Sequence, residues 1–232
     1  MVVASKAGID GDQWARCVQD RGWLWNAARS GSATGAANTL ILAHGAGAPM
    51  DSDWMTGMAE RLAARGVSVL RFEFPYMAQR RLDGGKRPPN PQAKLLETWR
   101  EVYAKVRRYA AGPLAIGGKS MGGRMASLVA DELGADRLVC LGYPFYAVGK
   151  PEKPRVAHLA QLQTPTLIVQ GERDALGNRE AVEAYTLAPS IELLWLVAGD
   201  HDLKPLKASG FTHEQHLDAA ADKIAHWLAQ TL

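Results

Sequence analysis

The feature that most constrains this chain is the pentapeptide GKSMG at residues 118–122, in which two glycines flank Ser120. It lies between an apolar run at 113–117 and a run of helical character at 123–133, so a strand, a sharp turn and a helix are expected. The glycines allow a turn too tight for neighbouring Cβ atoms, and such a turn exposes the serine hydroxyl. The pattern is typical of a nucleophile elbow, although a glycine-rich turn around an ordinary serine would give the same residues.

Strand-like and helix-like segments alternate along most of the chain. Short apolar runs typical of strands buried on both faces lie at 39–43, 67–74, 113–117, 137–142, 166–170 and 191–197. Helices are expected at 52–65, 91–111, 123–133, 179–187 and 212–232, the second with Asn90 as its N-cap. We therefore predict a single α/β domain over residues 1–232, with a mostly parallel twisted sheet, helices on both faces and all strand-to-helix turns at one edge.

Two segments interrupt this alternation. Apolar and aromatic residues at 12–28 flank an Asp-Arg-Gly turn and predict a hairpin of two short strands, followed by a loop at 30–38. Residues 76–91 hold three prolines and two glycines and predict a long, mobile loop that forms one wall of a ligand pocket, with 143–154 shaping another. Basic side chains in the first loop could bind an anionic ligand or could be solvated: Arg80, Arg81, Lys86 and Arg87.

Three side chains that could cooperate in nucleophilic catalysis fall just after predicted strands, at the edge of the sheet where ligands bind. A serine hydroxyl such as that of Ser120 needs a base, and imidazole, with an unperturbed pKa of about 6.5, suits that role. Among six histidines, His201 alone occupies a loop after the last predicted strand. Asp174, at the end of the preceding strand, would orient the imidazole. Alone, Asp174 could end an Asx turn and His201 could be an ordinary loop residue, but together they favour a triad.

The chain order serine, aspartate, histidine is similar to that of the α/β-hydrolases, and the resemblance extends from about Thr39 onward. More narrowly, the chain resembles small cap-less hydrolases related to dienelactone-hydrolase-like enzymes and to the hydrolase-like domain of testis-expressed and NSL-complex proteins. That branch includes members used as interaction scaffolds. The segments that carry the resemblance are LAHGAG at 42–47, RFEFPYM at 71–77, GGKSMGGR at 117–124, YPF at 143–145, GKP at 149–151 and QGERD at 170–174.

The resemblance implies a serine hydrolase that cleaves an ester, thioester or related acyl bond through an acyl-enzyme on Ser120. The backbone N–H groups of Ala46 and Met121 are expected to form the oxyanion hole. A serine peptidase is one alternative, and a non-catalytic binding or scaffolding module with the same fold is another. An intact triad argues against the second. Further substrate-binding positions are expected in the turn after the first buried strand and in the two loops: His44, Gly45, Gly47, Tyr76 and Tyr143.

Composition limits the partners that can be expected. The formal charge of +3, from 27 basic and 24 acidic residues, is scattered along the chain, so no nucleic acid partner is expected. No stretch offers about 18 consecutive apolar residues and residues 1–11 do not resemble a signal peptide, so we expect no membrane partner and a cytoplasmic location. The expected partner is a small-molecule acyl substrate, and the oligomeric state is left open.

Cysteine and histidine usage predicts neither a disulfide framework nor a metal site. Cys17 and Cys140 are the two cysteines, and their apolar neighbours indicate buried thiols. His213 and His216 stand three residues apart on the last predicted helix, which lacks the His-Glu-x-x-His spacing of zinc-binding helices. We therefore expect no metal and no cofactor.

Overall fold

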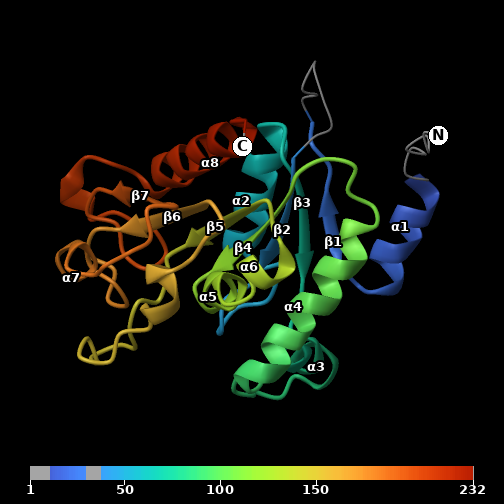
Figure 1. The fold of residues 1–232 in the computed structure, drawn as a ribbon, viewed down its shortest axis with the longest axis horizontal. Coiled ribbons are helices and arrows are strands. Elements are labelled where there is room, and N and C mark those ends of the chain that lie inside the picture. The colour runs from blue at the N-terminus through green and yellow to red at the C-terminus, as the bar shows by residue number, and fades with distance from the viewer. Residues whose placement is uncertain (1–10, 30–37, 232) are drawn as a thin grey trace.

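The structure, a computed structural model, describes residues 11–29 and 38–231. Within these residues seven strands form one sheet in the order β1-β3-β2-β4-β5-β6-β7 (Figure 1). β1 is antiparallel to β3 and all other neighbours are parallel, which confirms the predicted mostly parallel sheet. The strands are β1 (Leu24–Asn26), β2 (Thr39–Ala43), β3 (Ser68–Phe72), β4 (Leu114–Lys119), β5 (Arg137–Leu141), β6 (Thr166–Gly171) and β7 (Ile191–Leu196).

Helices cover both faces of this sheet, as predicted. In β2, Leu40 and Leu42 pack with α2 and α8, whereas Ile41 packs in the cluster that holds Trp99 of α4 and Met125 of α5. Successive side chains of a strand point to opposite faces, so each apolar strand supplies both cores. The described helices are α1 (Gly11–Asp20), α2 (Asp53–Ala64), α3 (Pro75–Asp83), α4 (Gln92–Arg107), α5 (Met121–Ser127), α6 (Ala130–Leu133), α7 (Arg179–Glu183) and α8 (His213–Ala229).

The predicted hairpin at 12–28 is wrong in its first half, which is helix α1. Trp14, Cys17 and Val18 recur at helical spacing and pack on the core. The Trp14 ring contacts Trp25 edge-on with centroids 5.0 Å apart, and it also contacts Tyr109 of the segment after α4. The second half does form a strand, but β1 pairs with β3 rather than with its own neighbour. The predicted loop at 30–38 lies, except for Asn38, outside the described residues.

The predicted long loop at 76–91 is also wrong in part, because helix α3 occupies its first half. Pro75 stands in the first turn, where a missing N–H costs nothing, and Gly84 ends the helix with a φ of 70°. Asn90 does not cap α4 as expected. Its side-chain oxygen accepts a hydrogen bond from the Tyr76 amide at 2.8 Å, which satisfies the first turn of α3 instead. The chain returns from Gly84 to α4 without regular structure.

The remaining elements follow the predictions with shifted ends. The expected helix at 123–133 is interrupted and forms α5 and α6, and the expected helix at 179–187 is only the short α7. Both described cysteines are free, buried thiols, and burial raises the pKa of the Cys140 thiol well above its usual range. No helix in residues 11–29 or 38–231 combines the length and the apolar character that crossing a membrane requires.

Candidate active site

Ser120 occupies a strained turn between β4 and α5. Its φ of 51° and ψ of −117° lie outside the usual regions for a residue with a side chain, which costs about 1–3 kcal/mol. The turn is held by the Ser120 amide, which donates to the Leu141 carbonyl at 2.9 Å. A Cβ on Gly118 would stand 2.7 Å from the Ala43 carbonyl oxygen, and one on Gly122 would stand 2.6 Å from the same atom. The two glycines are therefore required by close packing of the elbow against the end of β2.

The structure brings Ser120, Asp174 and His201 together at the carboxyl edge of the sheet. His201 Nε2 lies 2.9 Å from Ser120 Oγ, and His201 Nδ1 lies 2.8 Å from Asp174 Oδ2. An ionised carboxylate only accepts, so Nδ1 carries the proton and Nε2 is free to accept from the serine hydroxyl. This is the tautomer that a general base requires.

Asp174 is fully buried, and its carboxylate oxygens are satisfied by surrounding donors. Gln170 Nε2 donates to Oδ2 at 2.9 Å, and the Leu176 amide donates to Oδ1 at 2.8 Å. Hydrogen bonds to the charged form stabilise an ionised carboxylate in a buried place. The position of Asp174 is therefore set from three sides, which also orients the His201 ring.

The turn after β2 and the first residue of α5 carry the candidate oxyanion donors. Within the described residues, the amides of Ala46 and Met121 donate to no protein acceptor. Tyr76 supports the turn from below, since its hydroxyl donates to the Ala46 carbonyl at 2.9 Å. Burial raises the pKa of Tyr76 to about 12, which keeps this donor protonated at neutral pH.

His44 fixes the start of the same turn and does not reach the ligand. It is fully buried, its Nε2 accepts from the Phe74 amide at 3.1 Å, and its Nδ1 therefore donates to the Gly45 carbonyl at 2.7 Å. Burial lowers the pKa of His44, which favours the neutral ring that this pattern needs. The His44 imidazole therefore supports the turn, and substrate binding at this position stays a prediction.

Tyr143 and Tyr76 also differ from their predicted role as substrate contacts. Tyr143 is fully buried, its hydroxyl lies 3.4 Å from Ser127 Oγ, and its ring packs against Phe145. Burial raises the pKa of Tyr143 well above the usual tyrosine value. Tyr76 is almost fully buried beneath the turn after β2. Tyr76 therefore supports the turn after β2 from behind, whereas Tyr143 packs in the core.

A cavity of about 320 Å³ opens beside Ser120 and His201. Two of its walls were not found from the sequence: Trp54 and Met55 come from the start of α2, and Lys119 comes from the elbow itself. No local sequence pattern distinguishes the wall of a cavity from a core contact. The lining residues are Gly45, Ala46, Gly47, Ala48, Ser52, Trp54, Met55, Lys119, Ser120, His201 and Asp202.

Two of the four basic residues of the segment 76–91 are paired with carboxylates. Arg81 forms ion pairs with Asp51 at 2.8 Å and Glu73 at 2.6 Å, and Arg87 pairs with Asp83 at 2.6 Å. A guanidinium held by carboxylates has little capacity left for an anionic substrate. The structure thus contradicts an anion-binding role for Arg81 and Arg87 and gives none to Arg80 or Lys86.

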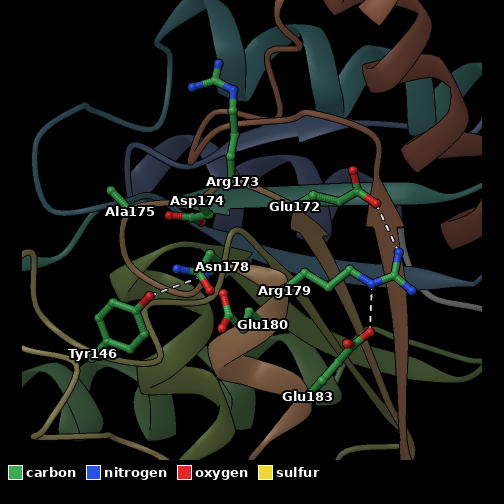
Figure 2. Close-up of a pocket in the computed structure, with 9 residues that line it drawn as sticks. All are labelled: Tyr146, Glu172, Arg173, Asp174, Ala175, Asn178, Arg179, Glu180 and Glu183. Atoms are coloured by element: carbon green, nitrogen blue, oxygen red, sulfur yellow. Dashed lines mark hydrogen bonds and ion pairs between the residues drawn. The ribbon is translucent and has the colours of Figure 1, made fainter.

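A second, shallower hollow of about 710 Å³ lies beside Asp174 (Figure 2). Its charged side chains satisfy one another: Arg179 bridges Glu172 at 3.0 Å and Glu183 at 2.7 Å. The Tyr146 hydroxyl accepts from the Asn178 amide. On α8, His213 and His216 contact the backbone carbonyls of Asp202 and Leu203. Among these features, none adds a chemical group to the site around Ser120.

Comparison with known proteins agrees with this fold. A family model described as an alpha/beta hydrolase domain matches residues 36–229. Among solved structures, a lid-less α/β serine hydrolase from Xanthomonas campestris has 19% identity and a TM-score of 0.65, and covers 90% of each chain. Dienelactone hydrolase from Anabaena variabilis has 20% identity and a TM-score of 0.65, over 88% of this chain and 89% of that one. An esterase domain from Rhodothermus marinus has 16% identity and a TM-score of 0.59, over 88% and 90%.

Proposed function

Because this chain belongs to the family of alpha/beta hydrolase domains, we propose that it is a serine hydrolase that cleaves an ester, thioester or related acyl bond through Ser120. The observation that carries the proposal is the continuous hydrogen-bonded line from Ser120 Oγ through His201 to the buried Asp174, with distances of 2.9 and 2.8 Å. The strain stored at Ser120 supports it as well, since such strain is concentrated at functional sites.

In the proposed reaction, His201 Nε2 accepts the hydroxyl proton as Ser120 Oγ attacks the carbonyl carbon. The negative charge that develops on the carbonyl oxygen is stabilised by the amides of Ala46 and Met121, while Asp174 stabilises the imidazolium. The leaving group departs with the proton from His201. Water then attacks the acyl carbon while His201 Nε2 accepts its proton. His201 returns this proton to Ser120 Oγ as the bond between Oγ and the acyl carbon breaks, which releases the acid and restores the serine.

A fluorophosphonate probe together with a panel of p-nitrophenyl esters tests this proposal. We expect covalent labelling of the purified protein and turnover of esters, whereas peptide amides are expected to be cleaved far more slowly. Peptide cleavage at a rate comparable to ester cleavage would favour the peptidase alternative. A folded protein with neither labelling nor turnover would favour the non-catalytic binding module.

The size of the cavity predicts a preference for short acyl chains. Its volume of about 320 Å³ is near the lower end of the range for small-molecule sites, and Trp54 supplies its largest side chain. We expect butyryl esters to be cleaved with higher kcat/KM than decanoyl esters. Trp54→Ala should raise the relative kcat/KM of the long ester by about tenfold, because several methylene groups gain room.

Trp54→Phe is the matched control for this prediction. Trp54 Nε1 donates to the Asp202 carbonyl at 3.1 Å, and both variants lose this hydrogen bond, but phenylalanine retains most of the wall. The chain-length preference should therefore persist in Trp54→Phe. A wild-type preference for long chains, or equal preferences in both variants, would show that Trp54 does not limit the substrate.

The proposed oxyanion donor predicts a contrast between two substitutions of Ala46. Ala46→Gly retains the amide and should leave turnover within a few-fold of wild type. Ala46→Pro removes the amide, and loss of one oxyanion donor typically costs about 10² to 10³ in kcat. Steady-state kinetics, with thermal unfolding to verify the fold, measures the contrast. Full activity in Ala46→Pro would move the donor to Gly45 or Gly47.

A further inference from the structure

The side chain of Lys119, the residue before the nucleophile, is almost fully buried in the candidate active site, with 9% of it exposed. Its Nζ donates to the His201 carbonyl at 2.7 Å and lies 3.2 Å from Asp202 Oδ1. The same atom stands 5.5 Å from the centroid of the Trp54 ring, within the range of a cation–π contact. The three N–H groups of the ammonium therefore face a carbonyl, a carboxylate and an aromatic ring.

A buried ammonium is costly, so its environment needs a physical account. Burial lowers the pKa of Lys119, and the nearby carboxylates of Asp202, Asp174 and Asp200 oppose that shift. An apolar side chain at this place would avoid the desolvation cost altogether. The ammonium therefore has a use that packing alone does not explain.

The His201 loop is restrained by contacts within itself, with the loop after β6 and with helices α2 and α8. Trp54 Nε1 donates to the Asp202 carbonyl, and His213 and His216 contact the carbonyls of Asp202 and Leu203. Asp200 Oδ1 accepts from the amides of Asp202 and Lys204, both at 2.9 Å. Arg173 Nε donates to the Ala198 carbonyl at 2.7 Å. Within the described part of the chain, no hydrogen bond other than that of Lys119 joins the backbone of this loop to the strand that carries Ser120.

We propose that Lys119 is a positioning residue for the general base: its ammonium holds the His201 carbonyl and so fixes the imidazole at the correct distance from Ser120. Because Lys119 and Ser120 are adjacent in sequence, the donor and the nucleophile move as one unit. This inference rests on the proposed hydrolase function, since it concerns the base of the same reaction. It adds a role that neither the triad nor the oxyanion hole contains.

Lys119→Met is the principal test, because methionine has a similar length and no donor or charge. We expect kcat to fall by about 10², the typical cost of displacing a reacting group by about 1 Å, with KM changing much less. The rate of fluorophosphonate labelling should fall in parallel, since labelling also depends on the His201–Ser120 geometry. Thermal unfolding verifies that the variant is folded.

Asp202→Asn is the matched control. It removes the negative partner of Lys119 but leaves the hydrogen bond to the His201 carbonyl, so kcat should fall far less than in Lys119→Met. Asp174 contacts the His201 imidazole, and the other charges on or against its loop include those of Lys119, Asp200, Asp202 and Arg173. Removing a positive charge stabilises an imidazolium and removing a negative one destabilises it. The acid limb of kcat/KM should therefore move to higher pH in Lys119→Met and to lower pH in Asp202→Asn.

A readout that needs no substrate separates this inference from the proposed function. The proton on His201 Nδ1, which is shared with Asp174, should give a resolved downfield NMR signal in the wild type, and the signal should broaden or vanish in Lys119→Met. An inactive wild type would overturn the hydrolase proposal, whereas an unchanged signal in Lys119→Met would overturn the positioning role.

Several outcomes would reject the role of Lys119. Wild-type kcat in Lys119→Met would mean that the loop is positioned by other contacts. Equal losses in Lys119→Met and Asp202→Asn would assign the effect to the ion pair and not to the carbonyl contact. If Lys119→Met does not fold, Lys119→Gln, whose shorter side chain does not reach the carbonyl, replaces it, and failure of both to fold would make Lys119 a purely structural residue.

Discussion

Ser120→Ala is expected to abolish fluorophosphonate labelling and to lower kcat for esters by about 10⁶, the scale of loss when a catalytic serine is removed. The fold should persist, because the serine side chain carries little packing energy and alanine keeps the same backbone constraints at a φ of 51°. Mass spectrometry of the labelled protein and thermal unfolding of the variant measure the two parts of this prediction.

Ser52→Ala is a matched control for the loss of the nucleophile. Ser52 lines the same cavity, and its hydroxyl has no hydrogen-bond partner within the described residues. Its replacement should leave labelling and turnover close to wild type. Labelling that persists in Ser120→Ala, at Ser52 or at any other serine, would remove Ser120 from the proposed role.

Asp174→Asn is expected to lower kcat by about 10⁴, as when the aspartate of a serine protease triad is replaced. The physical reason lies in the donors around the side chain. Gln170 Nε2 and His201 Nδ1 both face Oδ2, and the Leu176 amide faces Oδ1, so an NH₂ group at either place opposes a donor. If the asparagine NH₂ group took the place of Oδ2, the His201 ring would adopt the tautomer with its proton on Nε2. That nitrogen could then no longer accept the proton of Ser120.

Asp200→Asn is the control for this change, since the asparagine oxygen can still accept from the amides of Asp202 and Lys204. We expect Asp200→Asn to have a small effect on kcat. We expect Asp174→Asn to lose, in addition to its activity, about 1–3 kcal/mol of unfolding free energy, because a buried donor is left unpaired. Stopped assays at several pH values and denaturant unfolding provide the measurements. A silent Asp174→Asn with a severe Asp200→Asn or Asp202→Asn would identify a different acid.

Most of the sheet could be predicted from the sequence because its pattern is local. Strands β2, β4, β5 and β6 are buried on both faces. Such strands need apolar residues at successive positions, so each is visible in the sequence as a continuous apolar stretch. The elbow is equally local, since the glycines flanking Ser120 follow from the packing of one turn.

The errors fall where local patterns are ambiguous. The three apolar residues of α1 are compatible both with a short strand and with about one and a half turns of helix. The Asn90 side chain, which binds the Tyr76 amide at the start of α3, lies fourteen residues further along the chain.

By itself the sequence determined the α/β class, the turn that presents Ser120 and the order in which Asp174 and His201 follow it, because periodicity and turn chemistry depend on neighbouring residues. Only the tertiary structure decided that Tyr143 is buried, that Trp54 lines the cavity and bonds the Asp202 carbonyl, and that Lys119 bonds the His201 carbonyl. The last two contacts join residues 148 and 82 positions apart. Contacts between residues so far apart in sequence produce no periodic pattern in the sequence, because only the folded packing of the segments brings these side chains together.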